Sequence, residues 1–240
     1  SLKIVAHDAV ASDQFGNSVS LSRNVLAIGA NRADPGGIAD AGAAYLYKLE
    51  HNGTITYIDK VVAPDAAVDD KFALSVSMSG DLLAVGSNFS DPGGLTDAGS
   101  AYLYRLEHNG TVTFLDKMTA PDGVADDRFG RAVYQSGEIL AAGAHFSDPD
   151  GIGSAGAVYL FSDPSWAPYA PPITDNNFTT AINLWFSDEA NATATYGHIS
   201  AWDVSGVTNM YQAFMDKTSF NEDISAWDTS AVTSMDHMFF

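Results

Sequence analysis

The sequence predicts a mainly β chain: a partial β-propeller of four-stranded blades, followed by a capping helix and the start of a short-period solenoid. Three observations predict it. Residues 8–64 align without gaps on residues 65–121, with about 34 of 57 positions identical, and residues 122–161 begin a third copy. A second, shorter repeat follows near the C-terminal end, where the pattern of 199–214 returns at 224–239. Between the two repeats lies one stretch with helical spacing. Repetition at fixed periods is the sequence signature of repeat architectures.

Each copy of the longer repeat contains four runs of alternating apolar and polar residues. In the first copy these runs are residues 15–21, 24–30, 41–50 and 54–63. Such alternation predicts strands, and the turn residues between the runs separate them. Asn-Gly lies between the last two runs, at 52–53 and again at 109–110, which predicts a two-residue hairpin. Four-stranded antiparallel units repeated head to tail are typical of propeller blades.

The propeller is expected to be incomplete within this sequence. Residues 1–7 align with the end of the fourth run and predict the outer strand of a blade whose other strands are missing. The third copy stops at Phe161 before a fourth run. Because propellers usually need four or more blades, we expect further blades before Ser1; the alternatives are an unclosed piece, or a first strand that completes another blade.

The three copies resemble a known repeat. Residues 13–30 (DQFGNSVSLSRNVLAIGA), 70–87 and 127–144, each followed by AG-x-AYLY or a variant of it, are similar to FG-GAP repeats, the blades of the integrin α-subunit propeller and of many surface proteins. The resemblance implies a β-propeller. Calcium-binding members carry a DxDxDG-type loop between the first two strands of a blade. Here that connection is only SRN, SGD or SGE, so the usual calcium site of the family is absent.

A different acidic loop recurs between the second and third predicted strands. Its carboxylates are candidate Ca²⁺ ligands: Asp34, Asp40, Asp91, Asp97, Asp148 and Asp150. Hard oxygens on a turn suit Ca²⁺, and backbone carbonyls could complete the shell. The alternative is ordinary turn chemistry, in which the Asp of Asp-Pro-Gly-Gly bonds to its own backbone and Gly takes positive φ. An acidic loop exposed to solvent is the third interpretation.

The chain is expected to divide into blades over 1–161, a proline-rich linker over 162–174 and a helix-capped repeat region over 175–240. The linker cannot continue a sheet because proline removes ladder donors. The spacing i, i+3, i+4, i+7 and i+8 then places five apolar side chains on one helical face, with Thr174 or Asp175 as N-cap. These five side chains are Phe178, Ala181, Ile182, Trp185 and Phe186.

The shorter repeat carries one apolar set twice. The set Ile199, Trp202, Val207, Met210 and Phe214 returns as Ile224, Trp227, Val232, Met235 and Phe239. A period this short predicts a solenoid. The stretch FNEDISAWDTSAVTSMDHMF, residues 220–239, resembles the BspA-like surface-protein repeat, a relative of leucine-rich repeats. That resemblance covers about residues 173–240 and implies that the preceding helix is an N-terminal cap. Two coils are few for a stable solenoid, so we expect more repeats to follow.

Composition limits the partners. Thirty acidic and 11 basic side chains leave a net charge of −19, which disfavours nucleic acid and anionic membrane surfaces. No apolar run approaches the length of a membrane span, so membrane insertion is not expected in this segment. There is no cysteine, hence no disulfide and no thiol chemistry. Five Asn-x-Ser/Thr sequons could carry glycans if the protein is secreted by a eukaryote. They lie at Asn52, Asn88, Asn109, Asn177 and Asn191.

No residue pattern indicates catalysis. The paired carboxylates at 69–70 and 126–127 are the nearest to a glycosidase-like set, and a structural role is preferred for them. The expected function is therefore a non-catalytic adhesion or recognition module, extracellular or on the cell surface, that binds a protein or a glycan. A structural subunit of an extracellular filament or surface layer, self-associating with neighbouring chains, is one alternative. A carbohydrate-active propeller enzyme is the other.

Overall fold

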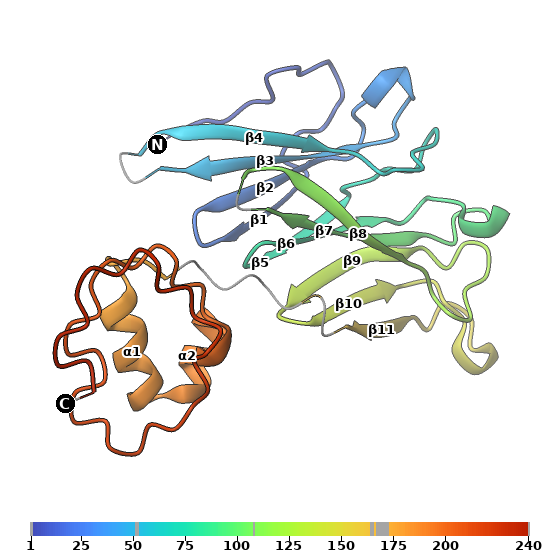
Figure 1. The fold of residues 1–240 in the computed structure, drawn as a ribbon. Coiled ribbons are helices and arrows are strands. Elements are labelled where there is room, and N and C mark those ends of the chain that lie inside the picture. Colours follow the sequence, from blue (N-terminus) through green and yellow to red (C-terminus); the bar gives the residue numbers. More distant parts are fainter. Residues whose placement is uncertain (1, 51–52, 108, 164–165, 167–172, 240) are drawn as a thin grey trace. The chain divides into compact units, whose positions relative to one another are not determined.

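A computed structural model of the chain describes residues 2–50, 53–107, 109–163, 166 and 173–239. The chain forms two compact units, Ser1–Pro168 and Tyr169–Phe240. The first unit holds three antiparallel sheets (Figure 1). Its strands are β1 (Ser18–Ser22), β2 (Val25–Ala30), β3 (Ala43–Leu49), β4 (Ile55–Val61), β5 (Ser75–Ser79), β6 (Leu82–Ser87), β7 (Ser100–Leu106), β8 (Val112–Met118), β9 (Phe129–Ser136), β10 (Ile139–Ala144) and β11 (Ala157–Ser162).

Each sheet is a blade whose strands follow chain order. Blade 1 is β1-β2-β3-β4, blade 2 is β5-β6-β7-β8, and blade 3 has the three strands β9-β10-β11. The predicted four strands per copy are confirmed in blades 1 and 2, and blade 3 has three strands within the described residues. A bulge falls after Leu46 where β3 pairs with β4, and the same bulge falls after Leu103 in blade 2. The two copies therefore share register as well as sequence.

The core of this unit lies between successive blades. Leu46 of blade 1 shares one apolar cluster with Phe72 and Val76. Phe72 precedes the first strand of blade 2, and Val76 lies in that strand. Leu103 of blade 2 shares the next cluster with Phe129 at the start of blade 3. Leu46, Phe72, Leu103 and Phe129 are fully buried. The repeated Phe therefore joins each blade to the one before it, because its ring is the largest apolar group in the loop that precedes the first strand of the blade.

Two local predictions are wrong. Residues 2–7 form no strand and pair with none of the described strands, because an outer strand needs the edge of a third strand as its ladder partner. The second Asn-Gly hairpin has a three-residue loop rather than a two-residue one. The Glu107 N–H donates to the Thr111 carbonyl at 2.8 Å, and the Gly110 N–H donates to the Glu107 carbonyl at 2.9 Å. Gly110 has φ +86°, as a three-residue loop with a glycine bulge requires.

The second unit begins with two helices, α1 (Phe178–Ser187) and α2 (Glu189–Tyr196). The predicted face of α1 is confirmed: Phe178, Ala181, Ile182 and Trp185 are buried, and Phe186 is partly buried. The predicted N-cap is wrong, since the residue at the N-cap position of α1 is Asn177. The α2 helix was not predicted, because its polar sequence carries almost no amphipathic pattern. Most of the predicted linker, residues 164–165 and 167–172, lies outside the described residues.

Asp175 is not free to cap α1 because it bonds to the coil that follows. Its carboxylate accepts hydrogen bonds from the Thr208 N–H at 2.8 Å, the Thr208 hydroxyl at 2.6 Å and the Asn209 N–H at 3.2 Å. Thr174 beside it forms a parallel bridge with Gly206. These contacts join the helical cap to the first coil of the shorter repeat, residues 199–214.

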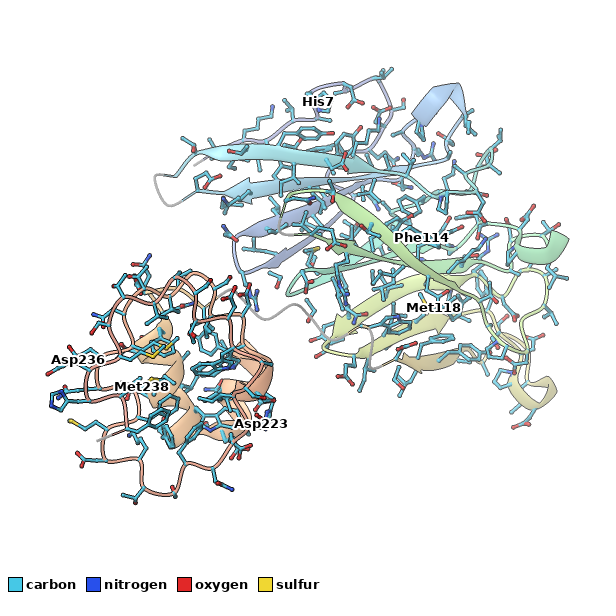
Figure 2. All side chains as sticks on the ribbon, viewed as in Figure 1. His7, Phe114, Met118, Asp223, Asp236 and Met238 are labelled. Carbon is cyan, nitrogen blue, oxygen red and sulfur yellow. The ribbon has the colours of Figure 1, made fainter. Side chains whose placement is uncertain are left out.

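The two coils, residues 199–214 and 224–239, stack through parallel backbone bonds. The Met210 N–H donates to the Ser234 carbonyl at 2.9 Å, and the Phe214 N–H donates to the Met238 carbonyl at 2.8 Å. Trp202 and Trp227 stack at 6.2 Å with planes 9° apart. Figure 2 shows Met238, which is buried, and Asp236, which is exposed, on this unit. Within the described residues no regular strand forms here, and no helix anywhere in them is long and apolar enough to cross a membrane.

The apolar set of the first coil is buried throughout, but that of the second coil is not. Ile199, Trp202, Val207, Met210 and Phe214 are all at most 3% exposed. In the second set Trp227 is buried, and Ile224 and Val232 pack at the edge of the core. Met235 and Phe239 are 45% and 63% exposed. The first coil has a neighbour on each side, whereas no coil in the described residues covers the outer side of the second.

Candidate functional site

The acidic loops hold their first aspartate in a turn. The Asp34 carboxylate accepts the Asp40 N–H at 2.7 Å, and the Asp91 carboxylate accepts the Asp97 N–H at the same distance. In blade 3 the Asp148 carboxylate accepts the Ser154 N–H. Each loop thus closes by an aspartate that bonds to the backbone at its far end, which is the turn chemistry that the sequence left as an alternative to calcium.

The second aspartate of each loop reaches the following blade. Asp40 pairs with Lys71, and Asp97 pairs with Arg128 at 3.0 Å. Burial raises the pKa of Asp97, and the nearby Arg128 lowers it by less. The third copy has Ser154 in place of this acid. Its Asp150 has a left-handed φ of +55°, and the aligned Gly36 and Gly93 are also left-handed.

Among the described residues, the structure brings no three candidate calcium ligands together. Across these parts of the chain no group of three or more His, Asp or Glu side chains has metal-binding geometry. A Ca²⁺ ion at Asp34 and Asp40 would have to displace the turn hydrogen bond and the Lys71 pair. The calcium interpretation stays a prediction, and terbium luminescence titrated against the chain tests it directly.

A second polar contact is repeated in the blades. The Asp65 carboxylate accepts the Tyr102 hydroxyl at 2.9 Å and pairs with Lys117 at 2.5 Å; Asp8, Tyr45 and Lys60 form the same set in blade 1. Burial raises the pKa of the Asp65 carboxyl, but Lys117 and Tyr102 lower it by more, so its net pKa lies below the ordinary value. Burial likewise raises the pKa of Tyr45 to about 12.

Replacing Asp65 with asparagine is expected to lower the melting temperature at neutral pH and to flatten its fall in acid. A carboxyl whose folded pKa is depressed stabilises the fold above its unfolded pKa of about 4, and this contribution is lost as pH falls through the folded pKa. Calorimetry between about pH 7 and pH 3 measures both effects. Asp122→Asn is the matched control, because Asp122 accepts the Tyr159 hydroxyl but blade 3 has, within the described residues, no fourth strand to supply a lysine. Equal pH profiles for D65N and the unmodified chain would contradict this role.

One carboxylate of each predicted pair is buried and bonded to the backbone. Asp70 and Asp127 are 5% and 3% exposed, and each accepts a backbone N–H three residues earlier. Burial raises the pKa of Asp70. Asp126, Asp127 and Asp148 line a hollow of about 340 Å³, but two of these three carboxylates are bonded to the backbone, Asp127 to Val124 and Asp148 to Ser154.

The sequons differ in access. Asn88 is 1% exposed, so a glycan at this position does not fit the folded blade, and that prediction is wrong. Asn109 is exposed and accepts the Thr111 N–H and hydroxyl, Asn177 is partly buried as the N-cap of α1, and Asn191 is exposed in α2. Asn52 lies outside the described residues. Glycosylation at Asn52, Asn109, Asn177 and Asn191 stays a prediction.

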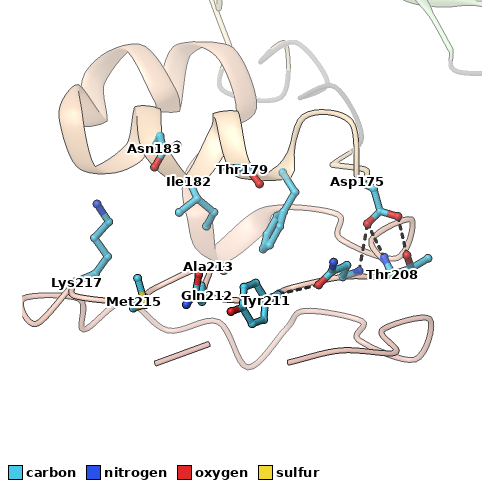
Figure 3. A pocket seen from close by; sticks show the side chains of 12 residues that line it. Asp175, Thr179, Ile182, Asn183, Thr208, Tyr211, Gln212, Ala213, Met215 and Lys217 are labelled. Carbon is cyan, nitrogen blue, oxygen red and sulfur yellow. Dashed lines mark hydrogen bonds between the residues drawn. The ribbon is translucent and has the colours of Figure 1, made fainter. Parts of the chain in front are cut away.

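A hollow of the second unit lies between α1 and the first coil. This groove has a volume of about 680 Å³. Figure 3 shows the side chains that line it. Its lining residues are Asp175, Phe178, Thr179, Ile182, Asn183, Thr208, Asn209, Tyr211, Gln212, Ala213, Met215 and Lys217. Most carry hydroxyl, amide or aromatic groups, so the groove can accept and donate hydrogen bonds and stack on a ring.

The groove is fixed by the backbone on both sides. Asp175 bonds to Thr208 and Asn209, and the Asn209 side chain accepts the Tyr211 N–H at 2.9 Å. Tyr211 is 52% exposed. The hydrogen bonds that Thr208 and Asn209 donate to the Asp175 carboxylate lower its pKa, which favours the ionised form that accepts them. The groove is therefore preformed on one side by α1 and on the other by the coil.

Sequence analysis does not identify this groove, because its two walls come from separate segments, 175–183 and 208–217. One signal is present: Tyr211 lies beside the buried Met210, where the repeat places Asp236 next to Met235 in the following coil. An aromatic residue at a position that the repeat leaves exposed indicates an exposed ring available for binding rather than for the core.

The fold defines a class of protein. Repeated antiparallel blades are joined through a buried phenylalanine, and a separate stack of short coils follows them. Residues 2–47, 56–104 and 112–161 match the FG-GAP repeat. These segments make up more than half of the chain, and the chain belongs to the FG-GAP repeat family. Residues 177–240 match a second family, described as Mycoplasma protein of unknown function, DUF285. No curated protein matches the chain.

Proposed function

We propose that the chain is a non-catalytic recognition module, extracellular or on the cell surface, whose groove between α1 and the first coil binds a partner. The observation that carries the proposal is the preformed groove of about 680 Å³ with an exposed tyrosine on its rim. Membership of the FG-GAP repeat family supports adhesion or recognition, and the match of residues 177–240 adds a second repeat region to the same chain.

The lining of the groove favours a glycan over a protein as its ligand. Asn183, Gln212 and Thr179 offer amides and a hydroxyl, which match the paired donors and acceptors of sugar hydroxyls. Tyr211 offers a ring face for the C–H face of a sugar. A protein partner would be expected to bury a larger apolar core than the few apolar groups of the lining supply.

Replacing Tyr211 with alanine is expected to weaken glycan binding by about tenfold, which is the loss of about 1.4 kcal/mol from a stacked ring. A glycan array identifies the ligand, and calorimetric titration of the unmodified chain and variant measures the change. Asp236→Ala is the matched control, because Asp236 occupies the aligned position of the second coil and is exposed outside the groove. Binding to no glycan on the array but to a protein would move the proposal to a protein ligand; equal affinities for Y211A and D236A would remove the groove as the site.

The repeat architecture extends the proposal. We infer that blades 1–3 are part of a β-propeller, supported by three successive sheets of the same register. We likewise infer that residues 199–239 are the first coils of a leucine-rich-type solenoid, supported by the parallel backbone bonds between the two successive coils. Both architectures present broad faces to partners without any chemistry of their own.

Two alternatives rest on other observations. A structural subunit of a filament or surface layer is supported by apolar side chains of blades 1 and 3 that are exposed among the described residues, such as Leu21 and Leu160. A carbohydrate-active enzyme would need a pair of carboxylates about 5 to 10 Å apart in a pocket. The acidic hollow of blade 3 is where that pair would lie, but Asp127 and Asp148 are held by backbone N–H groups, which supports a structural role for them.

A further inference from the structure

The contact between successive blades is built in the same way twice. A leading loop, residues 69–73 before blade 2 and residues 126–130 before blade 3, lies against the acidic loop of the preceding blade. The Phe72 N–H donates to the Ala41 carbonyl at 2.8 Å, and the Phe129 N–H donates to the Ala98 carbonyl at 2.9 Å. One cation of each leading loop pairs with the acidic loop, as Lys71 does with Asp40 and Arg128 with Asp97.

Glycines make room for the leading loop. A Cβ at Gly29 would lie 2.2 Å from the Ala73 carbonyl oxygen, and a Cβ at Gly86 would lie 1.9 Å from that of Gly130. A Cβ at Gly42 would lie 2.1 Å from the Phe72 carbonyl oxygen, with the same distance from Gly99 to Phe129. The next blade approaches too closely for any side chain at these positions.

Blade 3 has the same glycines, but among the described residues no leading loop lies against them. Gly143 and Gly156 are aligned with Gly86 and Gly99, but a Cβ there would meet no atom of another blade within 4 Å. They line a hollow of about 410 Å³. Beside it Val158 and Leu160 are 71% and 72% exposed, whereas the aligned Ala101 and Leu103 are fully buried.

Blade 1 carries the matching part. Its leading loop, residues 12–16, has φ +57° at Gln14, close to +55° at Lys71 and +56° at Arg128, so the undocked loop already has the backbone conformation of the docked ones. Behind it Val19 and Leu21 are 62% and 56% exposed. The aligned Val76 and Met78 are buried against blade 1.

The acidic loop of blade 3 and the leading loop of blade 1 have both lost the charged residue that pairs in the other contacts. The acid that receives the leading loop is Asp40 in blade 1 and Asp97 in blade 2, but Ser154 in blade 3. The aligned position of the leading loop holds a cation before blades 2 and 3, Lys71 and Arg128. Before blade 1 it holds the neutral Gln14. If just one end had lost its charge, docking would leave the other charge unpaired, which is costly. A neutral residue at both ends permits the two ends to dock on one another.

We propose that the exposed face of blade 3, which contains Gly143 and Gly156, binds the leading loop of blade 1 from a second copy of this chain. Among the described blades of one chain, blade 2 lies between these two faces, so the contact joins separate molecules head to tail. Such a heterologous interface builds rings or filaments. This inference does not depend on the groove between α1 and the first coil.

The contact between copies is weaker than the internal ones. The Ser75 hydroxyl donates to the Gly130 carbonyl at 3.0 Å, and the Ser77 hydroxyl accepts the Gln135 N–H at 3.0 Å. Blade 3 has Ala132 and Tyr134 at the aligned positions and supplies neither bond. We therefore expect association that rises with protein concentration, in the micromolar to about 1 mM range.

Sedimentation equilibrium of the whole chain tests this proposal. Gly143→Ala is expected to weaken association by about 10- to 100-fold, because its Cβ would collide with the docked backbone as at Gly86. Gly153→Ala is the matched control: no atom lies within 4 Å of its Cβ, and blade 1 has alanine at the aligned position 39. Circular dichroism and melting of each variant verify the fold.

A charge exchange tests the pairing itself. A chain with Ser154→Asp mixed with a chain carrying Gln14→Lys is expected to associate more tightly than either alone, since the mixture restores the pair seen between Lys71 and Asp40. A chain that stays monomeric up to about 1 mM would overturn the proposal. So would association that persists unchanged in G143A, which would place the contact elsewhere, for example on the exposed end of the second unit.

Discussion

Replacing Gly86 with alanine is expected to destabilise the blade unit by about 3 kcal/mol. The new Cβ would lie 1.9 Å from the Gly130 carbonyl oxygen of blade 3 and 2.3 Å from the Ser75 hydroxyl oxygen. Ser75 can turn away, but the Gly130 carbonyl belongs to a backbone held by both blades. The blades must therefore separate or bend, and the apolar cluster that includes Leu103 and Phe129 is disturbed with them.

Gly143→Ala is the matched variant for the same strand position in blade 3. Its Cβ would have a single neighbour, the Ala132 carbonyl oxygen at 3.9 Å, which is an ordinary contact. Because alanine in a strand loses less backbone entropy on folding than glycine does, we expect a change between zero and about 1 kcal/mol of added stability. Differential scanning calorimetry at low protein concentration measures both variants. Equal destabilisation by the two changes would show that the contact between blades does not set the cost at Gly86.

Replacing Phe214 with alanine is expected to destabilise the second unit by about 3 to 5 kcal/mol. Phe214 is 2% exposed, stacks on Phe220 at 4.3 Å and contacts the ring of Trp227 at 6.0 Å. Truncation to alanine leaves a cavity in the core that α1 and the two coils share. A loss of this size is comparable to the whole stability of a small domain, so the variant is expected to be largely unfolded at about 37 °C.

Phe239 supplies the control, because it occupies the aligned position of the second coil and is 63% exposed. It stacks on Phe214 at 5.1 Å from the outer side. Phe239→Ala is expected to lower the free energy of unfolding by less than about 1 kcal/mol. Urea unfolding followed by tryptophan fluorescence reports on this unit, since Trp185, Trp202 and Trp227 belong to its core. A large loss for F239A together with a small one for F214A would reverse the core assignment.

The sequence predicts the strands of each blade well because the signal is local. Alternating residues such as those of β5 (SVSMS) show the period of a strand directly, and the longer repeat presents the same pattern again in each copy. The buried face of α1 is predicted for the same reason, since Phe178, Ala181 and Trp185 fall on one side of a helix at short spacing. Patterns of this kind do not depend on distant parts of the chain.

Predictions that depended on a partner far along the chain succeeded less often. Residues 1–7 have the composition of a strand, but among the described strands residues 2–7 have no edge to pair with. Asp175 has the position of an N-cap, but the distant Thr208 takes its carboxylate. Asn88 has the sequence of a glycan acceptor but lies buried in its blade. In each case the surrounding fold, rather than the local sequence, determined the outcome.

The amino-acid sequence by itself determined the number and order of the blade strands, the amphipathic helix and the two repeat periods, because periodicity records which side of a local element faces the core. Only the tertiary structure decided the ion pairs of the acidic loops and the location of the groove. Asp40 and Asp97 pair with Lys71 and Arg128, which belong to the leading loop of the next blade. Such contacts depend on how blades and coils stack, and stacking brings together residues whose separation in sequence carries no pattern.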